Sequence, residues 1–263
     1  MIRLADRAAA APPLAPVTSV LRTTFGTDDL PGLHPGLLVA DETDWHPATA
    51  LTDSGRMPEL LASARRRWNA QPPAAAALTW KTYCYWLALP AVLGWASARR
   101  VPLLRAPDVL VRFEDHRPSL TVGLRRSTPV AVLPTDPLAL AGPPEVRVVA
   151  DEAELLAILR STLLDDHLAH VLAAIRREVR VGERTLLGSL ASGVATAILR
   201  SADALPGSSA TNVQTLLGTL GVDDLIELIP GPTGELTVQR KTCCLAFTLP
   251  SPKICSGCCI RTA

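Results

Sequence analysis

The stretch "AAAALTWKTYCYWLALPAVLGWASA", residues 74–98, is the apolar segment that constrains the fold most strongly. It is long enough to span a bilayer, for which about 20 apolar residues suffice. Lys81 lies inside it, however, and Pro90 would break or kink a helix at that position. We therefore predict two buried core helices here and no stable membrane insertion.

The composition of the whole chain agrees with a folded globular protein. The chain has 263 residues, of which 48% are hydrophobic and 19% are charged, so it can bury a substantial core. Its formal net charge is only +1, which gives no indication of a nucleic-acid partner. The first residues contain no uninterrupted apolar core followed by a cleavage site, so we expect no secretory signal and a cytoplasmic location.

Periodicity outside this segment predicts an α+β, helix-rich fold. The runs "DVLVRF", "SLTVGL" and "PVAVLP", within residues 108–133, are short and β-branched, and we interpret them as a small antiparallel meander in the N-terminal half. The C-terminal half is predicted to be helical, because apolar residues recur there every three or four positions. One last strand, "ELTVQR" at residues 235–240, leads into a cysteine-rich tail.

These patterns also give element and domain boundaries. Helices are expected at residues 57–68, 151–181, 185–202, 211–217 and 222–229. The predicted organisation is an irregular N-terminal region, helices with the β-meander, a helical region and a C-terminal cluster-binding segment, at residues 1–55, 56–145, 146–232 and 233–263. Residues 56–263 are expected to form one compact unit.

The tail "CCLAFTLPSPKICSGCC", residues 243–259, holds five of the six cysteines of the chain. Clustered cysteines in a reducing cytosol are more often metal or redox groups than disulfides. The Cys255-x-x-Cys258 spacing lets a tight turn direct two sulfurs at one metal, whereas the adjacent Cys243 and Cys244 require a sharp bend to do so. Soft thiolates select an iron–sulfur cluster, zinc or copper(I). A cluster, a zinc ion and unmetallated thiols all stay open on spacing alone.

The segment "RKTCCLAFTLPSPKICSGCC" resembles the C-terminal signature of the FhuF-type ferric-siderophore reductases, in which Cys-Cys-x10-Cys-x-x-Cys binds a [2Fe-2S] cluster. The likeness extends upstream to "HLAHVLAAIRREVRVGERTLLGSLASG" and to "LTWKTYCYWLALPAVLGWA", so that it covers about residues 60–263. The family often has proline after the last ligand, where this chain has Cys259. We interpret Cys259 as a spectator thiol.

This resemblance implies a cofactor, its ligands and a reaction. Cys243, Cys244, Cys255 and Cys258 would bind the [2Fe-2S] cluster. The protein would reduce Fe(III) in an intact siderophore, a hydroxamate, by one electron and so release Fe(II) in the cytosol. No dinucleotide or P-loop pattern occurs, so the electron would come from a donor protein such as a ferredoxin or flavoprotein. The alternatives are a zinc-stapled, non-catalytic binding module and a [2Fe-2S] electron carrier or redox sensor.

The basic residues that flank the cysteines have two readings. Arg240, Lys241 and Arg261 could offset the charge of an anionic cluster or attract an acidic ferredoxin, and they could equally be ordinary solvated charges.

Other chemically interesting residues are given structural roles. His167 and His170, with Asp166, have a spacing that could bind metal on a helix face, but we expect ordinary positions on an amphipathic helix. Cys84 is expected to be a small buried hydrophobe. Core packing is also expected for the aromatic block, although these side chains could line a substrate pocket: Trp80, Lys81, Tyr83 and Trp86.

Overall fold

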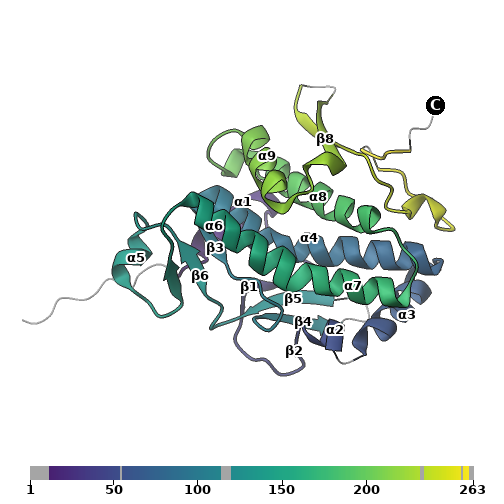
Figure 1. The fold of residues 1–263 in the computed structure, drawn as a ribbon, viewed down its shortest axis with the longest axis horizontal. Coiled ribbons are helices and arrows are strands. Elements are labelled where there is room, and N and C mark those ends of the chain that lie inside the picture. Colours follow the sequence, from purple (N-terminus) through teal and green to yellow (C-terminus); the bar gives the residue numbers. More distant parts are fainter. Residues whose placement is uncertain (1–11, 54, 114–119, 232–233, 256, 261–263) are drawn as a thin grey trace, which may run out of the picture.

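A computed structural model describes residues 12–53, 55–113, 120–231, 234–255 and 257–260. Its centre is one long helix, α4 (Pro72–Ala98), which runs through the middle of the molecule (Figure 1). The expectation of two separate helices was therefore wrong, because the helix continues through Pro90. Proline in a helix interior costs about 3 kcal/mol, but both halves of α4 are buried in the same core, with Leu87 and Leu93 fully inaccessible.

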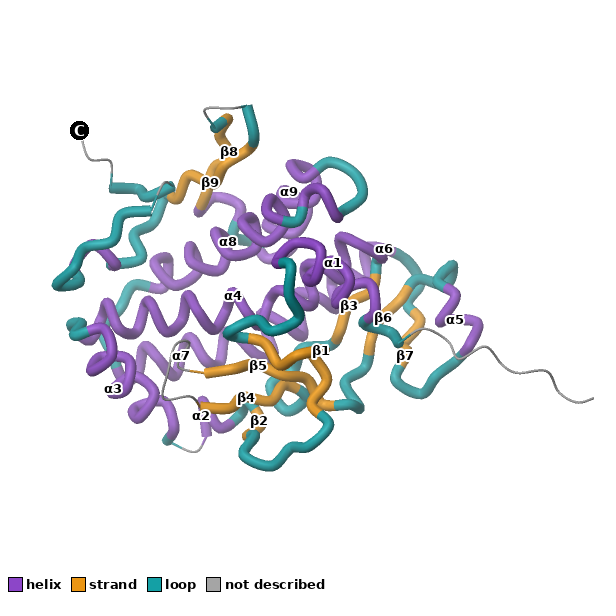
Figure 2. The backbone as a smooth tube through the Cα atoms, turned by 180° about the vertical axis from the view of Figure 1, so that it is seen from behind, coloured by secondary structure: helices purple, strands orange, loops and turns teal. Residues whose placement is uncertain are grey.

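Further helices pack against α4 or lie beyond its neighbours. They are α1 (Ala15–Phe25), α2 (Ala50–Asp53), α3 (Arg56–Trp68), α5 (Pro137–Ala141), α6 (Glu152–Arg160), a π-helical segment (Ser161–Leu168), α7 (Ala169–Glu178), α8 (Glu183–Arg200) and α9 (Ser209–Leu220). Helix α8 lies alongside α4 in both views (Figures 1 and 2), and the Trp80 indole N–H of α4 donates to the Leu186 carbonyl of α8 at 2.7 Å. These two helices form the scaffold on which the C-terminal tail rests.

The strands are short and belong to three separate sheets. They are β1 (Leu33–Val39), β2 (His46–Pro47), β3 (Arg100–Pro102), β4 (Val109–Phe113), β5 (Leu120–Arg125), β6 (Val130–Val132), β7 (Val146–Val148), β8 (Ile226–Pro230) and β9 (Leu236–Arg240). The sheet orders are β1-β5-β4-β2, β3-β6-β7 and β8-β9. The helix-rich α+β class predicted from the sequence is confirmed.

The predicted antiparallel meander is correct only for its first two strands. Strands β4 and β5 pair antiparallel, but β6 leaves them and joins β3 and β7 in a second sheet. Both sheets are mixed, since β1 pairs with β5 in parallel and β6 pairs with β7 in parallel. Alternation along a sequence identifies strands, but partner choice depends on packing between distant segments.

One predicted C-terminal helix is replaced by a strand. Residues 222–229 form a 3₁₀ turn, Asp223–Leu225, followed by β8, which pairs antiparallel with β9. The register places Ile226 opposite Arg240. The remaining helices lie close to their predicted bounds, and Asp151 explains where α6 begins, because its carboxylate accepts the Glu154 N–H at the N-cap.

The N-terminal region contributes to the same core as the rest of the chain. Val17 of α1 and Leu33 of β1 belong to the hydrophobic cluster that contains α4 and α8. The predicted division at residue 55 stays a prediction. None of the described helices combines the length and the continuous hydrophobicity that a membrane span requires.

Candidate functional site

The hairpin β8–β9 brings the two groups of cysteines in the tail together. Strand β9 leads directly into Cys243 and Cys244, and the tail later returns along β9. The Arg240 N–H donates to the Gly257 carbonyl at 2.9 Å, and the Gln239 side-chain amide donates to the Cys258 carbonyl at 3.0 Å. These bonds place the Cys-x-x-Cys arm beside the strand from which the first pair emerges (Figures 1 and 2).

Gly257 is required by this close approach. A Cβ atom at this position would lie 1.8 Å from the Val238 carbonyl oxygen, which is backbone and cannot move aside easily. Leu245 has a φ of 62°, and this left-handed residue bends the chain directly after the adjacent cysteine pair. The tail is therefore shaped by two local features, one beside each group of cysteines.

The four predicted ligands differ in exposure. Cys244 and Cys258 are buried, Cys243 is half-buried and Cys255 is exposed. The Cys243 sulfur accepts the Leu245 N–H at 3.3 Å, and the Cys258 sulfur accepts the Ile260 N–H at 3.4 Å. Hydrogen bonds to cysteine sulfur are among the features that tune the potential of iron–sulfur clusters.

Cys259 lies close to two of the predicted ligands. Burial raises the pKa of the Cys259 thiol, the neighbouring Cys243 and Cys258 raise it further, and the Arg240 cation opposes the rise. Within the described part of the chain, no three His, Cys, Asp or Glu side chains are placed to hold a metal ion. The assignment of Cys243, Cys244, Cys255 and Cys258 as ligands therefore stays a prediction.

Arg240 gives an independent test of whether this tail suits an anionic metal cluster. Arg240 is buried, with 4% exposed, so the interpretation as an ordinary solvated charge does not hold for this residue. One guanidinium nitrogen donates to the Ser189 hydroxyl at 3.0 Å, whereas Nε and Nη1 have no hydrogen-bond partner. A buried cation is costly unless an anion compensates it. A thiolate-ligated cluster carries negative charge, so the residues present fit such a group.

A cavity of about 700 Å³ adjoins the cysteine tail. Helices α4 and α8, strand β9 and the tail all contribute to its wall, and Cys255 and Gly257 are among the lining residues. Trp86 and Tyr85 supply aromatic surface, and their rings make an edge-on contact with centroids 5.0 Å apart. Small-molecule sites typically have volumes of about 300–1,000 Å³. The cavity therefore has the size of a ligand site and borders the candidate redox centre.

The aromatic block of α4 divides between core and cavity. Trp80 and Tyr83 are buried in the core, as expected, but Lys81 and Trp86 line the cavity. Sequence reasoning did not select these cavity residues. A signal was present in their spacing, because positions 78, 81, 82, 85 and 86 lie on one face of a helix.

The two glycines of α8, Gly188 and Gly193, have different neighbours. A Cβ at Gly188 would lie 1.9 Å from the Thr242 hydroxyl, so this glycine lets the tail approach α8. Gly193 faces Tyr85 of α4 at ordinary contact distance.

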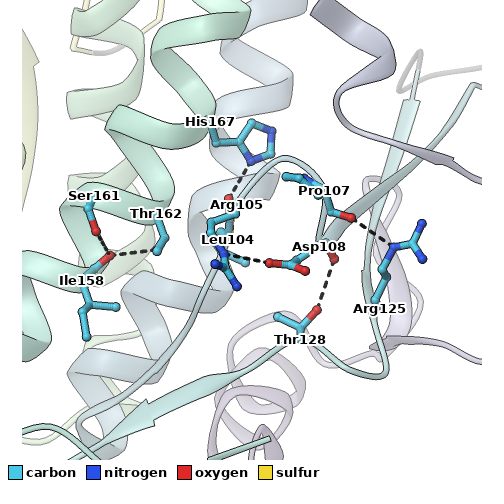
Figure 3. Close-up of polar contacts among 10 residues, drawn as sticks. All are labelled: Leu104, Arg105, Pro107, Asp108, Arg125, Thr128, Ile158, Ser161, Thr162 and His167. Atoms are coloured by element: carbon cyan, nitrogen blue, oxygen red, sulfur yellow. Dashed lines mark hydrogen bonds and ion pairs between the residues drawn. The ribbon is translucent and has the colours of Figure 1, made fainter. Parts of the chain in front are cut away.

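His167 and His170 do not form a common site. His170 is exposed, whereas the His167 imidazole is buried and bound between two core groups. Its Nδ1 lies 2.7 Å from the Leu104 carbonyl, as Figure 3 shows, and its Nε2 lies 2.6 Å from the Tyr83 hydroxyl. Because a carbonyl only accepts, Nδ1 carries the proton and Nε2 accepts from Tyr83. The structural role expected for these histidines agrees with this arrangement.

Comparison with known proteins decides the family. The family described as "Ferric iron reductase FhuF-like transporter" matches residues 78–219, which is more than half of the chain. The chain belongs to this FhuF-like family. The resemblance seen in the sequence is thereby confirmed over this range, which includes most of α4 and all of α8 and ends before the cysteine tail.

Solved structures show more distant similarity to this FhuF-like chain. Aerobactin synthetase IucA from a hypervirulent pathotype of Klebsiella pneumoniae matches with 18% identity and a TM-score of 0.49, over 74% of this chain and 37% of that one. The ATP-bound form of the same synthetase matches with 18% identity and a TM-score of 0.46, over 74% and 36%. The FhuF-like chain thus spans little more than a third of the length of these structures. No curated protein matches it.

Proposed function

We propose that this FhuF-like protein is a cytosolic ferric-siderophore reductase, which reduces Fe(III) in an intact hydroxamate complex to Fe(II). One electron is added to the iron, and a ferredoxin or flavoprotein supplies it. Oxygen ligands hold ferrous iron far less tightly than ferric iron, so the metal leaves the complex. Membership of the ferric iron reductase family supports this reaction.

The observation that carries the proposal is the shared boundary between the cavity and the cysteine tail. Cys255 and Gly257 belong to both. Cys243, Cys244, Cys255 and Cys258 would hold a [2Fe-2S] cluster, which supplies single electrons when bound, at roughly −400 mV for four-thiolate examples. A substrate in the cavity would lie beside Cys255, the one of these four residues among the described lining residues.

The other groups of the site have separate roles in this proposal. Trp86 and Tyr85 offer flat faces to a bulky chelate. The buried Arg240 guanidinium compensates negative charge at the cysteines through its two unpartnered N–H groups. Lys241 is exposed and follows Arg240 directly, so it remains available to an acidic donor protein.

The test is the metal and acid-labile sulfide content of anaerobically purified protein, followed by turnover of ferric hydroxamate complexes. About two irons and two sulfides per chain, with reduction of the ferric complex once the protein has been reduced with dithionite, are expected. One zinc and no sulfide would overturn the proposal in favour of the zinc-stapled module. If the protein holds a cluster but reduces no ferric complex, the result would overturn the reductase proposal in favour of an electron carrier or redox sensor.

A further inference from the structure

We propose that the cavity beside the cysteine tail selects ferric chelates by charge and prefers a complex with net negative charge. The inference rests on the proposed function and deepens it by assigning the substrate class. Four cationic side chains line the cavity: Lys81, Arg200, Arg240 and Lys253. No Asp or Glu lies among the described lining residues.

These cations come from different elements and converge on one space. Lys81 belongs to α4, Arg200 ends α8, Arg240 ends β9 and Lys253 lies in the tail. The chain as a whole has 26 basic and 25 acidic residues, so a purely basic lining is not a consequence of composition. Low-dielectric walls concentrate the field of like charges within a cleft.

Among the described residues, no Asp or Glu forms an ion pair with these four cations. Elsewhere the protein does pair its arginines, as Arg100 with Asp136 at 2.7 Å. The Arg200 guanidinium lies 4.7 Å from the Phe25 ring centroid, a contact that orients the side chain without neutralising it.

Half-buried aromatic side chains next to these cations define the ligand further. Trp86 and Tyr85 favour the apolar backbone of a chelate, and the cations favour carboxylate or other anionic arms outside its metal-binding groups. Hydroxamate groups alone neutralise ferric iron, so a plain trihydroxamate core brings no negative charge. The preferred substrate is therefore a hydroxamate chelate that carries additional acidic groups.

The experiment compares three redox-inert gallium(III) complexes that share one coordination sphere. Gallium desferrioxamine B carries one positive charge at its free amine, its N-acetyl derivative is neutral, and its N-succinyl derivative carries one negative charge. Binding to the full chain is followed by tryptophan fluorescence and calorimetry at low and high salt. We expect affinity to rise about fivefold at each step toward negative charge at low salt, and the difference to shrink at high salt.

A double variant and a matched control locate the effect. Lys81→Gln with Lys253→Gln is expected to bring the affinities of the anionic and cationic complexes within about threefold of each other. Arg177→Gln removes one exposed charge from α7, away from the cavity lining, and should keep the wild-type order. Equal affinities for the three complexes in the wild-type chain, tightest binding of the cationic complex, or no binding of any of them would overturn the inference.

Failure of this inference is distinguishable from failure of the proposed function. The corresponding iron(III) complexes are offered to the reduced protein and Fe(II) release is measured. Equal reduction of all three with equal gallium affinities would leave the reductase intact and remove the charge preference. If none of the iron(III) complexes is reduced but the gallium complexes bind in the predicted order, the reductase proposal is wrong and the preference of the cavity for anionic ligands holds.

Discussion

The backbone N–H of Arg240 donates to the carbonyl of Gly257 at 2.9 Å, and this bond joins the two arms of the cysteine tail. The two residues are separated by the loop that contains Cys243, Cys244 and Cys255. Closing this loop holds the second arm of the tail against the end of β9, where Cys255 and Gly257 line the cavity. The contact therefore couples the local shape of the tail to the position of the candidate redox site.

Replacement of Gly257 by alanine should open this loop. The new methyl group would lie 1.8 Å from the Val238 carbonyl oxygen, so the tail must move away from β9. We expect iron and sulfide content to fall at least severalfold, measured on anaerobically purified protein. The matched control is Gly218→Ala in α9, where nothing lies within 4 Å of the added atom. That variant should keep its metal and gain about 0.5–1 kcal/mol of stability.

Substitution of single cysteines by serine tests the ligand assignment. Cys243→Ser, Cys244→Ser, Cys255→Ser and Cys258→Ser should each lose most of the cluster, measured by sulfide content and EPR. Cys259→Ser should retain it. Cys84→Ser should also retain it, because burial raises the pKa of the Cys84 thiol to about 12 and keeps it protonated. If Cys259→Ser loses the cluster and Cys258→Ser retains it, Cys259 is the ligand and Cys258 is the spectator thiol.

Arg240→Met should change the stabilities of the loaded and metal-free proteins in opposite directions. Without the cluster, the substitution removes a buried cation with two unpartnered N–H groups, and we expect a gain of about 1–2 kcal/mol in urea unfolding. With the cluster, the lost cation should destabilise the protein and lower the reduction potential.

Arg240→Lys, which keeps the charge, serves as the control for Arg240→Met. The measurements are urea titrations before and after chelator treatment and an EPR-monitored potential titration. The same change in stability with and without metal would show that Arg240 does not compensate the cluster.

The buried His167 should make stability depend on pH. Burial lowers the pKa of His167 to about 4, whereas the same side chain has an ordinary value of 6.5. Between these values the unfolded chain binds the proton and the folded chain does not. Stability is therefore fully present above about pH 6.5 and falls as the pH drops toward 4, by about 3 kcal/mol in total.

His167→Gln removes this titration but also the bonds to Leu104 and Tyr83. It should lose about 1–3 kcal/mol at pH 7 and show a flatter profile between pH 4 and 6.5. Urea unfolding across this range is the measurement. His170→Gln, at an exposed position one turn later, should keep the wild-type slope. A His167→Gln profile as steep as the wild-type one would assign the pH dependence to other groups.

Local patterns were sufficient for much of this protein. Helix α3 was predicted at residues 57–68, and α8 and β9 were predicted from their periodicity. The cysteine spacing indicated a metal or cluster tail, and the resemblance it carried led to the correct family. Such features depend on residues that are neighbours in the chain, so the sequence alone reports them.

Helix continuity, strand pairing and the burial of charge depend on contacts between distant segments, so only the tertiary structure decided them. The sequence could not show that α4 continues through Pro90, because the compensating burial comes from helices and strands that are distant in the chain. It could not assign β6 to β3 and β7, since alternation is the same whichever strand pairs. The burial of Arg240 against Ser189, and the basic cavity that forms beside Cys255, arise only where α4, α8, β9 and the tail meet. Composition and periodicity determined which elements form, and packing between them determined where charge is buried and where a ligand can bind.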